Sequence, residues 1–129
     1  LLFVDYSAKY YTSNVPPTRR GKFVLMQEKD AEHLVVAPIE LCSWHANIVE
    51  RFLNDRQVAG DYTTRERDHY EHYDQAWNIA GGGYWEVDEE QKRLHLFGQS
   101  TAYGRYVDNA LKTRIASLGE FHGYNILVE

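Results

Sequence analysis

The stretch His95-Leu-Phe-Gly-Gln-Ser-Thr-Ala-Tyr-Gly104 decides how this chain is organised. Leu94, Leu96 and Phe97 predict a partly buried strand, because apolar and aromatic residues suit a pleated sheet. Small residues follow, and their main-chain N–H groups can face outward. A helical pattern begins near Asp108. Strand, small-residue turn and helix start together form a common anion cradle, although many such turns bind nothing.

Apolar runs elsewhere in the chain predict the rest of a sheet. Besides residues 93–97, strands are expected at residues 1–6, 22–28, 33–39, 76–80 continuing to 84–87, and 124–128. The glycines at 81–83 interrupt a strand pattern, which indicates a bulge or a close approach of another backbone. Residues 15–21 contain two prolines and are expected to form a connector.

Two segments have helical periodicity. Residues 44–53 form an amphipathic pattern with Ser43 as its expected N-cap, which places His45 in the first turn. The positive end of a helix lowers the proton affinity of a histidine, so His45 is a candidate general base. The alternative is a histidine that only hydrogen-bonds the preceding loop.

The second helical pattern extends from an Asp108 cap to a stop at Gly119. Its apolar and facing positions are Val107, Ala110, Leu111, Arg114, Ile115 and Leu118. Strands and helices together predict a single α/β (α+β) domain over residues 1–129. A mixed β-sheet of about six strands would carry two packed α-helices.

Residues 54–75 are expected to form a polar insertion or an extra helix. Thr63 and Glu66 have the spacing of a capping box, which favours a short helix over residues 65–74 with an Arg67–Glu71 pair. His69 and His72 would then lie one turn apart. They resemble a metal pair, but a solvated charged face is the favoured interpretation.

Composition narrows the function classes. The 129 residues include 43% apolar and 26% charged residues, which suits one soluble domain with one core. A formal charge of −5 argues against nonspecific nucleic-acid binding. The single Cys42 excludes an internal disulfide and a cysteine-based zinc site. No apolar run has the length of a membrane span, so no membrane partner is expected, and the oligomeric state stays open.

Four segments resemble the phosphohistidine phosphatase/Janus family, in the order in which that family carries them. They are Lys22-Phe-Val-Leu-Met26, Trp44-His-Ala-Asn-Ile48, Gly81-Gly-Gly83 and Phe97-Gly-Gln-Ser-Thr-Ala-Tyr-Gly104. The similarity spans roughly residues 20–129. It implies a small cytoplasmic domain that removes phosphate from phosphohistidine without a metal or another cofactor.

The resemblance also implies roles for particular residues. His45 would be the catalytic histidine, as a base toward water or as a nucleophile, and Lys22 the strand lysine near the phosphate. The Ser100, Thr101 and Ala102 turn would donate hydrogen bonds to the phosphoryl oxygens, as phosphoryl transfer requires. Gly83 and Tyr84 would line the ligand site. The partner would be a phosphorylated protein or a small phosphorylated molecule.

The chain departs from that family at two places. Tyr84 follows the triple glycine, and Ala37 lies in the strand eight residues before His45. The family has an arginine at each of these two positions. Each missing guanidinium removes a bidentate phosphate donor. Arg105, or Arg19 and Arg20, are candidates to replace them.

Three functions therefore stay open. The first is a phosphohistidine phosphatase-like hydrolase that uses His45, Lys22 and the turn. The second is a noncatalytic or respecialised anion- or small-ligand-binding domain of the same fold, which the missing arginines favour. The third is purely structural and predicts no cavity between Lys22, His45 and Ser100.

Overall fold

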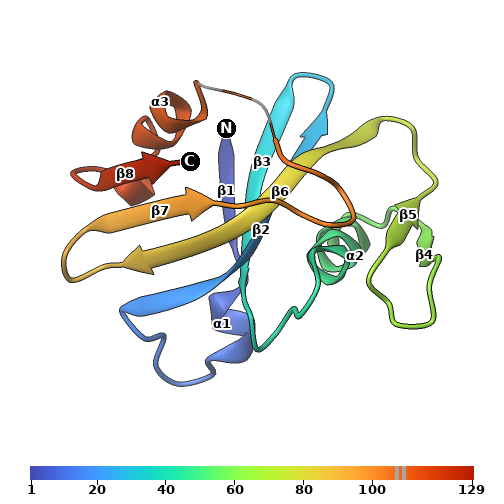
Figure 1. Ribbon diagram of the computed structural model, residues 1–129, viewed down its shortest axis with the longest axis horizontal. Coiled ribbons are helices and arrows are strands. Elements are labelled where there is room, and N and C mark those ends of the chain that lie inside the picture. The colour runs from blue at the N-terminus through green and yellow to red at the C-terminus, as the bar shows by residue number, and fades with distance from the viewer. Residues whose placement is uncertain (107, 109) are drawn as a thin grey trace.

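A computed structural model describes residues 1–106, 108 and 110–129, and it contains one main sheet (Figure 1). The strands of this sheet are β1 (Leu2–Asp5), β2 (Thr18–Glu28), β3 (Ala31–Pro38), β6 (Trp77–Asp88), β7 (Arg93–Phe97) and β8 (Asn125–Val128). The helices are α1 (Ser7–Tyr10), α2 (His45–Asp55), α3 (Leu111–Ala116) and the 3₁₀ turn η1 (Gly119–Phe121). A separate hairpin contains β4 (Gly60–Tyr62) and β5 (Tyr70–His72).

The sheet is mixed, and its strand order is β1-β3-β2-β6-β7-β8. The central strands pair antiparallel, whereas β1 joins β3 and β8 joins β7 in parallel. The predicted fold class, an α+β domain with a mixed sheet of about six strands, is therefore confirmed.

Alternating side chains of the long central strands build two cores on opposite faces of the sheet. Val24 and Met26 of β2 pack with the apolar side of α2. Phe23 and Leu25 of the same strand face the other way, against α3 and η1. Because both faces are buried there, the register of β2 is strongly specified.

One sequence prediction about the strands needs correction, and one is confirmed. The connector predicted at 15–21 ends early, because Thr18 already pairs with Asp88 and β2 begins there. The prolines precede this strand, where a missing N–H breaks no ladder bond. Residues 76–80 and 84–87 are parts of one strand, β6, whose register with β2 shifts between Ile79 and Gly81. The predicted glycine irregularity is thus confirmed.

The helix predicted over residues 65–74 is wrong, because the segment forms the β4–β5 hairpin. Tyr62 lies opposite Tyr70, and the two rings pack edge to face at 5.2 Å. Thr64, rather than Thr63, bonds an acidic side chain, that of Asp68. Arg67 takes a left-handed conformation with φ of 60°. Aromatic cross-strand pairing outweighs the local helix signal here.

The C-terminal helix is shorter than predicted. It starts at Leu111, and the Asp108 carboxylate accepts a hydrogen bond from the Ala110 N–H just before it, at 2.9 Å. The helical position predicted at Val107 lies outside the described residues. Among the described residues, no helix has both the length and the apolarity needed to cross a lipid bilayer.

Gly81 offers a test of this architecture. Its φ is 146°, and an added Cβ would meet the Tyr106 backbone, with the Cα at 2.9 Å. We expect Gly81→Ala to lower the free energy of unfolding by roughly 2 kcal/mol in urea denaturation. Gly119→Ala is the control, because a Cβ there meets nothing within 4 Å. Equal losses in both variants would contradict the close approach at Gly81.

Candidate functional site

The glycines of β6 bring together elements that are far apart in the sequence. A Cβ on Gly82 would lie 3.0 Å from His45 Cδ2 and 3.4 Å from Ser100 Cβ. A Cβ on Gly83 would fall on the Phe97 carbonyl oxygen. The first residue of α2 and the turn after β7 therefore both contact the strand where it has no side chains. Figure 1 shows the chain after β7 running toward α2 before it reaches α3.

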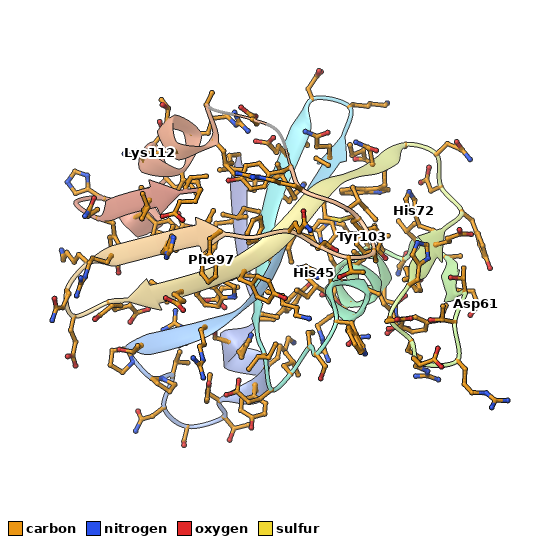
Figure 2. All side chains as sticks on the ribbon, viewed as in Figure 1. His45, Asp61, His72, Phe97, Tyr103 and Lys112 are labelled. Atoms are coloured by element: carbon orange, nitrogen blue, oxygen red, sulfur yellow. The ribbon has the colours of Figure 1, made fainter. Side chains whose placement is uncertain are left out.

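His45 is the first residue of α2, and Trp44, rather than the predicted Ser43, is its N-cap. The Trp44 N–H donates to Asn47 Oδ1 at 3.0 Å, which satisfies one end group of the helix. Burial leaves only 5% of His45 exposed. Figure 2 shows its side chain at the start of α2.

The hydrogen bond of His45 assigns its tautomer. Nε2 lies 2.7 Å from the Gly83 carbonyl oxygen, which can only accept. The neutral ring therefore carries its hydrogen on Nε2, and the lone pair is on Nδ1. A backbone carbonyl thus fixes which nitrogen can act as a base or nucleophile.

The pKa of His45 is lowered to about 4. Burial is the largest cause, because it disfavours the charged ring. The positive charge of Lys22 lowers the pKa further, and the bond to Gly83 opposes both. The sequence predicted this direction from the helix terminus, whereas burial dominates. His45 is therefore neutral near pH 7.

Lys22 approaches the site from β2, where it pairs in register with Tyr84 and Ala37. Its Nζ donates to the Ser43 carbonyl at 2.6 Å. The ammonium also lies 5.1 Å from the Trp44 ring centroid and 5.7 Å from that of Tyr84. Burial lowers the Lys22 pKa. The Lys22 ammonium thus lies directly before the first turn of α2, between the rings of Trp44 and Tyr84.

The turn after β7 is closed by its own hydrogen bonds. Ser100 and Gly104 exchange backbone bonds of 3.2 and 2.8 Å, and the buried Ser100 Oγ accepts from Tyr103 N at 3.1 Å. Among the described residues, the N–H groups of Thr101 and Ala102 have no acceptor. They are the donors that an anion cradle needs. The predicted helix start is not part of it, since α3 begins only at Leu111.

The chain matches a family model, described as the Janus/Ocnus family (Ocnus), over residues 14–125. The chain belongs to the Janus/Ocnus family. A comparison with curated proteins finds no match. We call His45, Lys22 and the Ser100–Gly104 turn the His45 cluster. The family match covers every element that contributes to it.

In this Janus/Ocnus chain, Tyr84 covers one side of the cluster. Its ring is 39% exposed, lies edge-on to His45 with centroids 6.0 Å apart, and stacks on Phe97 at 5.8 Å. Gly98 permits this stacking, because its Cβ would lie 2.7 Å from the Tyr84 ring. Tyr84 and Phe97 also line a surface hollow of about 300 Å³ that adjoins the cluster.

The three arginines proposed as replacements differ in their positions relative to the site. Arg19 is buried in ion pairs with Asp5 and Glu89, so it cannot serve the site. Arg20 lines the hollow beside Tyr84. Arg105 is exposed and its backbone runs beside Gly81, two residues before the Gly83 that bonds His45. No hydrogen bond or ion pair joins Arg105 to His45 or Lys22 within the described part of the chain.

Sequence reasoning missed two residues that shape the cluster. Trp44 covers the Lys22 ammonium, and Tyr103 bonds the hairpin through its hydroxyl. Their positions next to His45 and inside the small-residue turn were the available signals. The residues described contain no group of three or more metal-ligating side chains. His69 stacks on Tyr103, and His72 bonds the Trp77 carbonyl.

The buried neutral His45 predicts a pH dependence of stability. Below pH 6.5 the unfolded chain protonates this ring, whereas the folded protein does so only near pH 4. Acidification should therefore cost stability, about 2 kcal/mol from His45 by pH 5. His45→Gln keeps a donor for Gly83 but does not titrate. Between pH 7 and pH 5 its free energy of unfolding, measured in urea, should therefore fall by about 2 kcal/mol less than that of the parent protein. The lowered pKa of His33 contributes equally to both proteins.

Proposed function

We propose that this Janus/Ocnus domain is a metal-independent hydrolase of phosphoramidate bonds. Its substrate is phosphohistidine in a protein or a small phosphoramidate. The single observation that carries the proposal is the state of His45: neutral, buried, and held through Nε2, with no hydrogen bond to Nδ1 from any residue that the structure describes. Lys22 donates to the Ser43 carbonyl, two residues before His45. His45 and Ser100 both approach Gly82.

In the proposed reaction, the N–H groups of Thr101 and Ala102 hold the phosphoryl oxygens, and Lys22 supplies positive charge. As a base, His45 Nδ1 takes a proton from the attacking water while an O–P bond forms and the P–N bond breaks. That proton returns to the leaving imidazole, which departs neutral with inorganic phosphate as the second product. As a nucleophile, Nδ1 would instead bond to phosphorus while the substrate P–N bond breaks and the leaving imidazole takes a proton from water. The hydroxide formed, or a second water, would then break the Nδ1–P bond and release phosphate, which leaves His45 neutral again.

The proposal places the protein in the cytoplasm, with a phosphorylated protein or small molecule as its partner and no nucleic acid or membrane. The cytoplasmic setting is consistent with the free, buried thiol of Cys42.

A second candidate is a binding domain without turnover. It is favoured by the aromatic rings of Trp44 and Tyr84 next to the Lys22 ammonium. It is also favoured by the hydrogen bond that this ammonium already donates to Ser43 O. It is also favoured by Ala37 and Tyr84, which flank Lys22 in the sheet at the two positions of the missing guanidiniums. Such a site is less cationic and more apolar than a phosphatase site, and suits a less charged ligand.

Phosphate release from a phosphohistidine peptide, with a chelator present, tests the first function. We expect His45→Ala to lower the rate by at least about 100-fold, as the loss of a general base does. His122→Ala, at an exposed histidine, should leave it unchanged. Equal rates for His45→Ala and the parent protein would remove His45 from the reaction. No release from a folded parent would favour the binding domain.

Tyr84→Arg separates the two candidates from another direction. A guanidinium beside Lys22 should raise kcat/KM for the phosphohistidine peptide about 10-fold, because it adds a charged donor to the phosphoryl group. Tyr73→Arg adds the same charge at a site that is 64% exposed on the hairpin. A gain confined to Tyr84→Arg supports the phosphoryl site. A similar gain in both variants reflects net charge alone and places Tyr84 away from the phosphoryl group.

A further inference from the structure

The β4–β5 hairpin contacts the turn of the candidate site through one side chain. The Tyr103 hydroxyl accepts from the Tyr70 N–H at 3.1 Å and donates to the Tyr70 carbonyl at 2.8 Å. The Tyr103 ring also stacks on His69, with centroids 5.7 Å apart. Figure 2 shows Tyr103 between His45 and the hairpin that carries Asp61 and His72. Tyr103 thus bonds both the backbone N–H and the backbone carbonyl of Tyr70, the first residue of β5.

The same hairpin contacts the first turns of α2. Asn47 Nδ2 donates to the Tyr62 hydroxyl and to the Arg67 carbonyl, both at 3.1 Å. The Tyr62 hydroxyl in turn donates to Glu50 at 2.8 Å. The other amide atom of Asn47, Oδ1, accepts from Trp44 N, directly before His45.

The contacts made by Tyr103 and those made by Asn47 meet inside the hairpin. The Tyr62 and Tyr70 rings pack against each other, and Tyr70 is buried. A continuous set of contacts therefore leads from Asn47 through Tyr62 and Tyr70 to Tyr103. Burial raises the pKa of both the Tyr62 and the Tyr103 hydroxyl to about 12, so both remain neutral donors near pH 7.

We infer that the β4–β5 hairpin is a positioning element that sets the distance between His45 and the Thr101–Ala102 turn. Tyr103 is the positioning residue at one end, and Asn47 at the other. The inference deepens the proposed hydrolase function and rests on it for the kinetic part of its test. Nδ1 and the turn N–H groups must address one phosphoryl group together, and a misplacement of about 1 Å can cost 100-fold in rate.

Tyr103→Phe removes both hydrogen bonds to Tyr70 and keeps the ring. We expect kcat on the phosphohistidine peptide to fall about 10-fold or more, while the acid limb of the pH profile stays near the His45 pKa of about 4. Tyr73→Phe is the matched control, since it makes the same change at an exposed position of the hairpin. An unchanged kcat in Tyr103→Phe, or an equal fall in both variants, would overturn the inference.

A second measurement does not need activity. Amide hydrogen exchange reports on the Ser100 and Gly104 N–H groups, which bond each other's carbonyls across the turn. Tyr103→Phe should speed exchange there about 10-fold while Val24, in the centre of the sheet, stays protected. Unchanged exchange at both residues contradicts the positioning role. If the parent hydrolyses nothing, the proposed function fails, and this exchange result alone decides the role of the hairpin.

Asn47→Asp tests the other end. Its carboxylate can still accept from Trp44 N, but it loses both donors to the hairpin. If the contacts form one unit, the double variant with Tyr103→Phe should lose no more kcat than the more severe single variant. Its exchange at Ser100 and Gly104 should likewise match that variant. Additive losses would mean that the two ends act independently, which contradicts a joint positioning element.

Discussion

The absence of side chains on β6 at Gly82 and Gly83 is the constraint on which the His45 cluster depends. A Cβ on Gly82 would crowd His45 and come into contact with Ser100, and one on Gly83 would overlap the Phe97 carbonyl. The exposed strand backbone also supplies the carbonyl that His45 Nε2 bonds. One stretch of bare backbone therefore brings the helix and the turn together and selects the tautomer of the histidine.

Aromatic side chains form the immediate surroundings of the Lys22 ammonium. Trp44 and Tyr84 surround the Lys22 ammonium without adding positive charge. Lys22 alone then lowers the pKa of His45 by its charge, in addition to burial. This balance yields a site that keeps its histidine neutral while it presents less charge to a ligand than two guanidiniums would.

The sequence predicted the sheet because its strands are short apolar runs. It predicted His45, Lys22 and the Ser100 turn as site residues through short motifs. Two kinds of information were missing. The helix signal at Thr63 was local, whereas Tyr62 and Tyr70 form strands because they pack across the hairpin and against α2. Arg19 is held away from the site by ion pairs with Asp5 and Glu89, which lie 14 and 70 residues away in the sequence. Side-chain partners this distant leave no periodic pattern.

The contacts that build the cluster have large sequence separations. His45 bonds Gly83 across 38 residues, Tyr103 bonds Tyr70 across 33, and Lys22 bonds Ser43 across 21. Non-local contacts form late because loop closure must precede them. The candidate site therefore cannot assemble in a folding intermediate that contains only local hairpins. The same condition holds on the ribosome, where a nascent chain lacks a complete cluster until synthesis has passed Gly104.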